Sequence, residues 1–178
     1  MMEQRLYMTQ GLPGSGKTTW AKDQMLGTTG LIGRANRDDI RRLCIPDGSS
    51  PMGYRFSKKT ERLVTEIQRD MVERMLLTGM SVIIDDTNLN YGHFDPWKQL
   101  AWDLEVGVSL VQFHVSVGEC QRRQVGRPPA EQVPYDVIKR MSERWESEKM
   151  DWAIAVDDIL TGPAFQIPID TDTARCHS

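Results

Sequence analysis

The segment Gly11-Leu12-Pro13-Gly14-Ser15-Gly16-Lys17-Thr18 constrains this chain more than any other feature, because it matches the pattern G-x-x-x-x-G-K-[ST] at every fixed position. A strand pattern at residues 5–9 precedes it and a helical pattern at residues 17–26 follows it. Glycines in such a turn let several backbone N–H groups point inward, and the start of the helix adds partial positive charge. The sequence therefore predicts a loop that binds the phosphates of a nucleotide.

The side chains of this loop have distinct expected roles. Lys17 would reach the β- and γ-phosphates, and the Thr18 hydroxyl would coordinate Mg²⁺ (or Mn²⁺) beside ATP or another NTP. Further phosphate contacts are expected from Gly14, Ser15, Gly16 and Thr19. The loop alone does not separate kinases from GTPases, ATPases or motors. The small size of the chain favours a kinase, and the lack of an N-K-x-D-like guanine box counts against a GTPase.

Short apolar segments alternate with helical patterns along the chain. Strand patterns cover residues 5–9, 30–35, 81–84, 108–115 and 165–169, and helical patterns cover residues 17–26, 37–43, 57–78, 95–104, 119–125 and 135–150. This alternation is typical of a parallel sheet with crossover helices. We predict one α/β domain over residues 1–170, with a central parallel sheet flanked by helices, and a flexible tail over residues 171–178.

Several single residues are expected to be structural. The longest helix is indicated by apolar residues that recur at helical spacing, namely Leu63, Ile67, Met71, Met75 and Leu76. The tryptophans in helix patterns are interpreted as core or interface residues (Trp97, Trp102, Trp145 and Trp152), and Trp20 as packed under the phosphate loop. The isolated histidines are interpreted as structural or exposed (His93, His114 and His177).

Composition excludes other classes of protein. The scattered cysteines, Cys44, Cys120 and Cys176, lack CxxC spacing, so we expect a reducing compartment with no zinc site and no disulfide framework. The start lacks the apolar region of a signal peptide, and no apolar run approaches the roughly 18 residues of a membrane span. These features predict a cytoplasmic protein without a membrane partner.

The net charge of −3 argues against a nucleic-acid partner, but the charge is unevenly distributed. Residues 34–62 hold eight basic and four acidic side chains, a local excess of +4. Such a patch can attract a polyanion, or it can be an ordinary solvated helix face.

Two polar segments follow predicted strands, at the sheet edge where the phosphate loop should also lie. In Asn36-Arg37-Asp38-Asp39-Ile40-Arg41, either aspartate could take the proton of an attacking hydroxyl, and Arg37 and Arg41 could hold an acceptor phosphate. The same residues also suit a helix capped by Asn36. The second segment ends a buried strand with Asp85-Asp86-Thr87-Asn88, which could face a metal or an acceptor, or could merely turn the chain.

A basic cluster, Arg122, Arg123 and Arg127, precedes Pro128-Pro129 and another helix. Arginines on such a helix and loop can close over a γ-phosphate and neutralise charge in the transition state. An exposed basic helix end is the alternative.

Together these segments resemble the phage-type polynucleotide 5′-hydroxyl kinase family, the kinase half of enzymes that heal broken RNA and DNA ends. The matching residues are GLPGSGKTTW at 11–20, NRDDIR at 36–41, DTNLN at 86–90, and Arg123 and Arg127 ahead of Val133-Pro134. The resemblance extends from residue 5 to about residue 145. It implies a P-loop NTPase fold with a helical lid, and transfer of the γ-phosphate of ATP or another NTP to the 5′-hydroxyl of single-stranded or 5′-OH-ended RNA or DNA, as in nucleic-acid repair.

The resemblance also implies residue roles. Asp38 would be the general base, Arg41 would hold the 3′-phosphate of the terminal nucleotide, and Asp86 would support the acceptor site by anchoring Arg41. Thr87 and Asn88 would lie beside the acceptor. Arg127 would be the lid arginine on the ATP phosphates, with Arg123 as a helper.

The chain departs from the family in two respects. It ends before a C-terminal phosphatase domain, so we expect either a stand-alone kinase or one domain of a longer protein. Its lid segment, residues 121–134, needs a one-residue gap. A phage-encoded enzyme would act in the host cytoplasm. The alternatives are a P-loop kinase for a small-molecule hydroxyl and a non-catalytic NTP-binding module. RNA or DNA preference, donor choice and oligomeric state do not follow from the sequence.

Overall fold

A computed structural model describes residues 4–27, 31–50, 53–54, 56–147 and 167–169. Its strands form one parallel sheet in the order β2-β3-β1-β4-β5. They are β1 (Arg5–Gln10), β2 (Ile32–Ala35), β3 (Ser81–Ile84), β4 (Gly107–Phe113) and β5 (Ile167–Ile169). In the central strand, Leu6 lies opposite Val82 of β3 and Val108 of β4. The predicted α/β fold with a central parallel sheet is confirmed.

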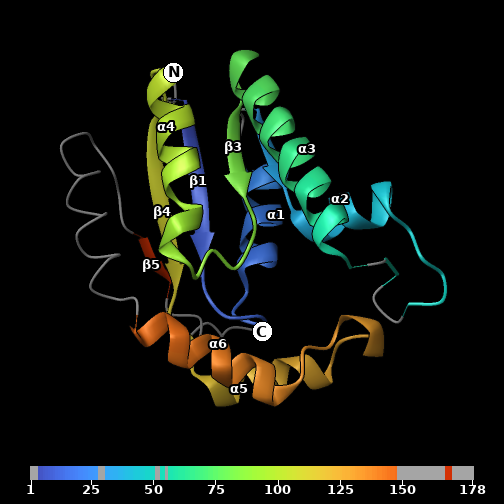
Figure 1. The fold of residues 1–178 in the computed structure, drawn as a ribbon. Coiled ribbons are helices and arrows are strands. Elements are labelled where there is room, and N and C mark those ends of the chain that lie inside the picture. Colours follow the sequence, from blue (N-terminus) through green and yellow to red (C-terminus); the bar gives the residue numbers. More distant parts are fainter. Residues whose placement is uncertain (1–3, 28–30, 51–52, 55, 148–166, 170–178) are drawn as a thin grey trace.

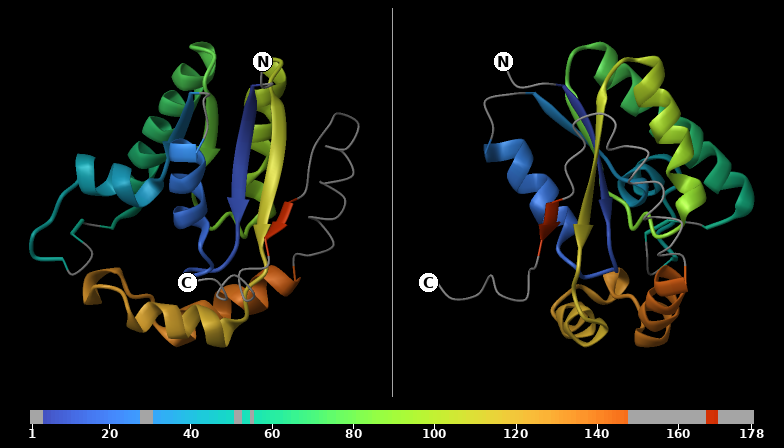
Figure 2. Two further views of the ribbon diagram at one scale, coloured as in Figure 1. Left: turned by 180° about the vertical axis from the view of Figure 1, so that it is seen from behind. Right: turned by 90° about the vertical axis from the view of Figure 1, so that its left-hand side faces the viewer.

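Helices cover both faces of this sheet. They are α1 (Lys17–Gly27), α2 (Arg37–Cys44), α3 (Lys58–Leu77), α4 (Asp95–Asp103), α5 (Val117–Val125) and α6 (Tyr135–Ser147), with short 3₁₀ turns at Tyr91–His93 and Pro129–Glu131. The helix α1 lies on one face of the sheet, and α3 and α4 lie on the other (Figure 2). Across the carboxyl ends of the strands lie α5 and α6 (Figure 1). The sheet edge that carries the phosphate loop is therefore the edge that these two helices cover.

Local polar groups determine where several helices begin. Ser57 accepts a hydrogen bond from the Thr60 amide, and the Thr60 side chain accepts one from the Ser57 amide, which is a complete capping box. Asn36 caps α2 through the Asp39 amide, as the sequence suggested. Ser116 caps α5 through the Glu119 amide, so this helix begins at Val117, two residues before the predicted start.

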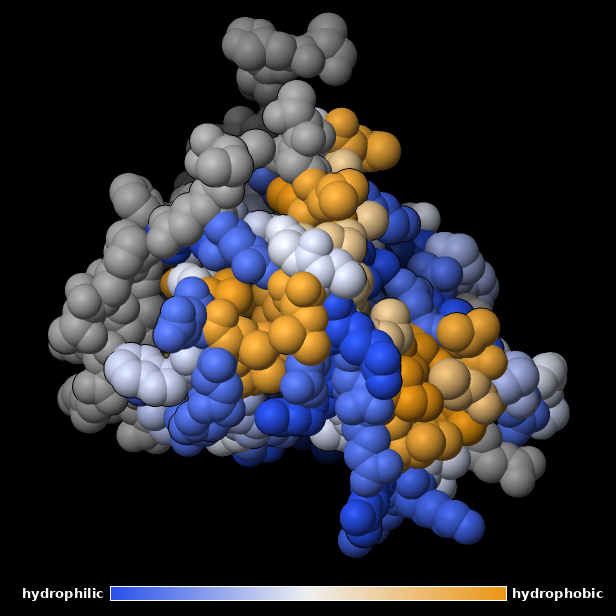
Figure 3. Space-filling view, turned by 90° about the horizontal axis from the view of Figure 1, so that it is seen from above, coloured by the Kyte–Doolittle hydropathy of each residue, from blue (hydrophilic) through white to orange (hydrophobic). Residues whose placement is uncertain are grey.

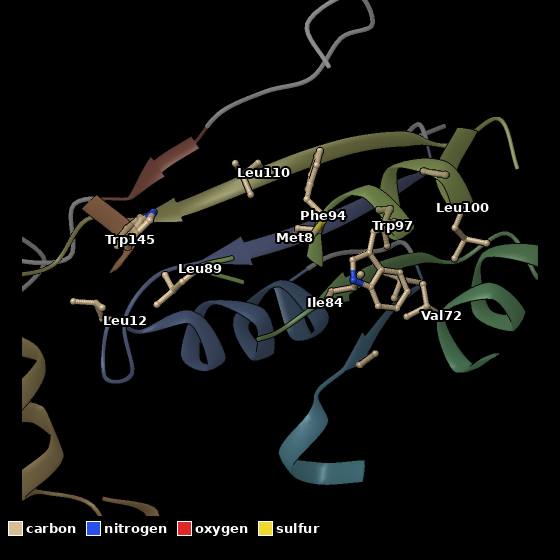
Figure 4. Packing of buried hydrophobic residues seen from close by; sticks show 14 of the residues in the cluster. Met8, Leu12, Val72, Ile84, Leu89, Phe94, Trp97, Leu100, Leu110 and Trp145 are labelled. Carbon is tan, nitrogen blue, oxygen red and sulfur yellow. The ribbon is translucent and has the colours of Figure 1, made fainter. Parts of the chain in front are cut away.

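The core fills the space between the sheet, α3 and α4 (Figure 4). Leu6, Met8, Val82 and Ile84 are fully buried in the strands, and Phe94 is fully buried at the start of α4. Parallel strands that are covered on both faces require apolar residues on both sides, which explains their short continuous apolar runs. The rigid core fixes the strand ends from which the polar segments emerge.

The apolar residues whose spacing predicts α3 coincide only partly with its buried face. The buried positions are Val64, Gln68, Val72 and Leu76, whereas Leu63 and Met71 are exposed. The buried seam includes a glutamine, so a search for apolar residues alone selects a neighbouring stripe. The reason for burying this glutamine lies in its contact with Asp86.

The tryptophan predictions were mostly correct. Trp97 and Trp145 are buried, but Trp102 is 80% exposed, so its assignment to the core was wrong. Trp20 makes edge contacts with the rings of Tyr7 and Phe113 on β1 and β4. Trp152 lies outside the described residues.

Of the other single residues, His114 stacks on Trp145, which fits its expected structural role. Cys44 and Cys120 are free cysteines. His177, Cys176 and the predicted tail at residues 171–178 lie outside the described residues.

The end of the molecule opposite α5 and α6 carries hydrophobic areas separated by hydrophilic side chains (Figure 3). Leu26, Leu31 and Leu77, at the ends of α1, β2 and α3, are exposed. Within the described ranges, no helix has both the length and the apolar character that crossing a membrane would need.

Candidate active site

The phosphate loop between β1 and α1 requires glycine at Gly14 and Gly16, whose φ angles are 90° and 100°. A Cβ atom at Gly14 would lie 2.8 Å from both the Cys120 carbonyl oxygen and Gln124 Nε2. Because α5 packs this closely on the loop, only glycine fits. The loop and α5 therefore form one contiguous surface.

Lys17 is held inside this loop. Its ammonium group donates hydrogen bonds to the carbonyl oxygens of Gly11 (2.9 Å) and Leu12 (2.8 Å) and to Ser15 Oγ (3.3 Å). The pKa of Lys17 is lowered to about 8, mainly by burial, and the positive charge of Arg127 contributes to this lowering. The structure thus brings Lys17 and Arg127 within electrostatic reach of each other. Thr18 and Thr19 begin α1 beside the loop.

Asp85 lies at the end of β3, and its charge acts on Lys17 to raise the lysine pKa. The Asp85 side chain is buried, and its Oδ2 atom accepts hydrogen bonds from Arg34, with Nε at 2.7 Å. The Asp85 Oδ1 atom is buried and has no hydrogen-bond partner within the part of the chain that the structure describes. A carboxylate oxygen that is buried and unpaired carries a cost that a cation would remove.

The oxygen donors at the end of β3 and the start of α1 suit magnesium. Asp85 Oδ1, beside Lys17, and the hydroxyl of Thr18, the next residue, are hard ligands of the type that Mg²⁺ prefers. Within the described ranges, no group of three or more His, Cys, Asp and Glu side chains could hold a metal ion unaided. This arrangement fits an ion held mainly by nucleotide phosphates and one or two protein oxygens.

Asp86 does not anchor Arg41, contrary to the expectation from sequence. Its Oδ2 atom accepts a 2.6 Å hydrogen bond from Gln68 of α3, and its Oδ1 atom accepts a 3.1 Å bond from the Arg37 amide at the start of α2. Burial raises the pKa of Asp86 to about 6. The carboxylate therefore fixes the start of α2 against β3 and α3.

The residues that follow Asp86 connect it to β1. The Thr87 carbonyl accepts a hydrogen bond from the Gly11 amide, and the Asn88 amide group donates to the Thr9 carbonyl at 2.8 Å. Asn88 is buried and has a positive φ of 44°, so its side chain joins two strand ends. This placement is structural, in contrast to the acceptor contact expected for Asn88.

Asp38 and Asp39 have different surroundings. Both carboxylate oxygens of Asp39 are paired, one with Arg34 and one with Arg42. Asp38 Oδ1 accepts hydrogen bonds from Arg41 (2.6 Å) and from the Tyr54 hydroxyl (3.0 Å). Asp38 Oδ2 has no partner among the described residues, and the side chain is half exposed. Asp38 is thus the aspartate with an oxygen open to a substrate.

The anchor of Arg41 is Glu61, in the first turn of α3, which sequence reasoning did not assign a role. Glu61 accepts bonds from Arg41 Nε (2.7 Å) and Arg41 Nη2 (2.6 Å), and from Arg37 Nη2 (3.0 Å). The hydrogen bonds from Arg41 lower the pKa of Glu61. No sequence spacing links residue 61 to residue 41, so only the packing of α2 on α3 reveals the pair.

Most of the arginines counted in the basic excess over residues 34–62 are paired with carboxylates. They are Arg34, Arg37, Arg41, Arg42 and Arg62. Attraction of a polyanion by this patch stays a prediction.

In α5, Arg123 reaches the phosphate loop. It pairs with Glu119 at 2.6 Å, and its Nη1 atom lies 3.4 Å from the Gly14 carbonyl oxygen. Arg122 pairs with the same glutamate from a more exposed position. Gln124 is buried between the loop and Val133, whose amide donates to Gln124 Oε1 at 3.1 Å. Arg122 and Arg123 thus lie on the helix that packs on the loop, whereas Arg127 follows the end of that helix.

Comparison with known proteins agrees with this geometry. Residues 6–147 match the model of a family described as an AAA domain (AAA_33). The chain belongs to this family. A relative from Autographa californica nuclear polyhedrosis virus, named provisionally as a bifunctional polynucleotide kinase/RNA ligase, is 33% identical over 104 residues. That match covers 54% of this chain and 14% of the viral protein.

Solved structures show the same AAA-domain fold. A chain in the structure of the Pnkp1/Rnl/Hen1 RNA repair complex is 25% identical with a TM-score of 0.70, and the match covers 85% of this chain and 47% of that chain. Kti12 from Chaetomium thermophilum, in complex with ADP-AlF3, is 18% identical with a TM-score of 0.59, covering 95% of this chain and 92% of that one. A gluconokinase from Sinorhizobium meliloti is 14% identical with a TM-score of 0.54, covering 94% and 82%.

The last two likenesses concern the fold alone. The resemblance to polynucleotide kinases inferred from the motifs is confirmed, and this chain spans less than half the length of the viral and repair-complex proteins.

Proposed function

We propose that this protein is a polynucleotide 5′-hydroxyl kinase, which transfers the γ-phosphate of ATP or another NTP to the 5′-OH end of RNA or DNA. The observation that carries the proposal is the open Oδ2 atom of Asp38, next to Arg41 on a helix tied to the end of β3. A phosphoryl acceptor needs a proton acceptor for its hydroxyl and a cation for its own phosphate. Asp38 and Arg41 supply the two side by side.

The reaction would be an in-line transfer. The 5′-oxygen forms a bond to the γ-phosphorus while the bond from that phosphorus to the β–γ bridging oxygen breaks, and ADP leaves. The proton of the 5′-hydroxyl passes to Asp38 Oδ2. Because Arg41 and Tyr54 both hold Oδ1, the carboxylate cannot rotate freely and Oδ2 stays directed outward.

The donor would bind in the phosphate loop. Lys17 and Arg127 would stabilise the negative charge that spreads over the transferring group, with Arg123 assisting from α5. Thr18 and Asp85 would hold magnesium, which neutralises phosphate charge when bound. Gly14, Ser15, Gly16 and Thr19 would contribute contacts to the donor phosphates.

Support for a nucleic-acid acceptor comes from the names of two relatives, a viral polynucleotide kinase/RNA ligase and an RNA repair complex. The acceptor side would comprise Arg37, Asp38 and Arg41, with Asp86 and Thr87 behind them. A gluconokinase shares the fold, so the experiment must distinguish a nucleic-acid acceptor from a small-molecule acceptor.

A minimal acceptor tests this proposal. If Arg41 holds a 3′-phosphate, a nucleoside 3′-phosphate should accept the γ-phosphate at its 5′-hydroxyl, and the matching nucleoside should be at least tenfold poorer in kcat/KM. Gluconate and other small alcohols serve as controls. Transfer to a small alcohol with none to the nucleoside 3′-phosphate would contradict the proposal.

A further inference from the structure

Two aromatic rings flank the arginine of the acceptor cluster. The Arg41 guanidinium carbon lies 5.5 Å from the centroid of the Tyr54 ring and 6.0 Å from that of Phe56. Both rings come from the segment between α2 and α3. Neither ring has a role in the donor site or in the proton transfer described above, apart from the bond of Tyr54 to Asp38.

The two rings differ in exposure. Tyr54 is buried, forms a β-bridge with Pro46 and donates its hydroxyl hydrogen bond to Asp38. These contacts give Tyr54 a structural role. Phe56 is 62% exposed, so its contact with Arg41 leaves much of the ring open to solvent. A single exposed phenylalanine is unremarkable by itself. Phe56 becomes a candidate for substrate binding because it lies beside Arg41, which is proposed to hold a nucleotide phosphate.

The chemistry of the neighbourhood suggests a planar ligand. A nucleobase attached to the sugar on either side of a bound phosphate lies within several ångströms of that phosphate. Proteins commonly hold single-stranded nucleic acid by combining a phosphate-binding cation with an exposed aromatic ring. Stacking on such a ring tolerates different sequences because every base has a π-face. Asp38, Arg41 and Phe56 would then contact hydroxyl, phosphate and base, respectively.

We infer that Phe56 is a stacking platform for a nucleobase of the acceptor strand, one of the two that flank the phosphate held by Arg41. This inference rests on the proposed polynucleotide kinase activity and specifies how the acceptor is recognised. Stacking on Phe56 would favour a nucleotide over a small alcohol, since a small alcohol offers no ring to stack.

A double-mutant cycle between protein and substrate tests the platform. Wild type and Phe56→Leu are compared on one 5′-OH oligonucleotide with all bases present and on two versions that lack the first or the second base. Leucine keeps an apolar side chain but removes the ring. Wild type should lose about 5- to 150-fold in kcat/KM when the stacked base is removed, the range for one base stacked on an aromatic side chain.

Phe56→Leu should lose a similar factor on the intact oligonucleotide and little more on the abasic one. Phe56→Trp should retain the wild-type discrimination. Trp102→Leu is the matched control, because Trp102 is also an exposed aromatic residue but lies on α4. If the substitution merely disturbed Arg41, activity would fall equally on every oligonucleotide.

If Phe56→Leu lowers kcat/KM by the same factor on intact and abasic strands, Phe56 is not a stacking platform. The proposed kinase activity would be unaffected by that result. Absence of transfer to any oligonucleotide by the wild type would instead reject the proposed function. A loss confined to removal of the first or of the second base would identify which nucleotide stacks.

Discussion

Replacing Glu61 with glutamine tests whether the acceptor arginine is positioned by α3. Glu61 accepts three charged hydrogen bonds, two from Arg41 and one from Arg37. Hydrogen bonds to charged groups contribute about 1.5–3 kcal/mol each. A glutamine keeps one acceptor oxygen but directs an NH₂ group at the guanidinium nitrogens. The substitution should therefore weaken the positioning of Arg41 by about 2–4 kcal/mol.

A second effect of Glu61→Gln acts in the opposite direction and favours acceptor binding. Removing the Glu61 charge also removes its repulsion of an acceptor phosphate on Arg41. At about 8 Å this repulsion is about 0.5 kcal/mol in water and about 2 kcal/mol at an effective dielectric constant of 20. With midpoint values of about 3 and about 1.3 kcal/mol, the loss of positioning exceeds the relief of repulsion by about 1.7 kcal/mol. Glu61→Gln should therefore lower kcat/KM for a 5′-OH oligonucleotide by roughly 15-fold, at about 1.4 kcal/mol per tenfold.

Steady-state kinetics measure this effect, with the oligonucleotide varied at saturating ATP and then ATP varied at saturating oligonucleotide. The loss should appear with the oligonucleotide and leave the KM for ATP within about twofold of wild type. Glu66→Gln is the matched control, because Glu66 lies on the same helix and pairs with Arg62 in an exposed position, where a pair contributes about 0–1 kcal/mol. An unchanged or raised kcat/KM in Glu61→Gln would refute the positioning argument.

Three further substitutions probe the rest of the site. Asp38→Asn should lower turnover by about 10²–10⁴, the scale of a lost general base, with ATP affinity from calorimetry little changed; wild-type turnover would show that another group takes the proton. Arg127→Ala should lower kcat by about 10³ in single-turnover assays, whereas a loss below about tenfold would move the role to Arg123. The pKa of Asp86 is raised from 3.8 to about 6 in the folded protein, so folding favours its protonated form. The resulting contribution to the free energy of unfolding is complete below about pH 4 and is lost as pH rises through 6. Wild type should therefore lose up to about 3 kcal/mol of unfolding free energy between pH 4 and 7 that Asp86→Asn does not lose, and parallel denaturant-unfolding profiles would contradict this.

The fold and the donor loop could be predicted from sequence because their signals are local. The G-x-x-x-x-G-K-[ST] pattern places a turn, a helix start and a lysine within eight residues. Alternating strand and helix patterns then gave most element bounds to within about two residues. The Asn36 and Ser57 caps were also visible, since a cap and the amide that it binds lie three residues apart.

The partners within the acceptor site could not be predicted, because they depend on how α2 packs on α3 and β3. Glu61 binds Arg41 across twenty residues, and Gln68 binds Asp86 across eighteen. Gln68 also interrupts the buried seam of α3, so apolar spacing alone does not identify the buried face of this helix. Asp38 and Arg41 form an ion pair because i and i+3 residues of a helix share one face, and their roles toward an acceptor stay predictions.

Transfer of labelled γ-phosphate tests the central claim most directly. The protein is incubated with γ-labelled ATP, magnesium and, in separate reactions, a 5′-OH RNA, the matching 5′-OH DNA, their 5′-phosphorylated forms and a panel of small alcohols. We expect label at the 5′ end of a 5′-OH strand, none on the 5′-phosphorylated strands, and loss of transfer in Asp38→Asn. Label on a small alcohol with none on any strand would contradict this expectation.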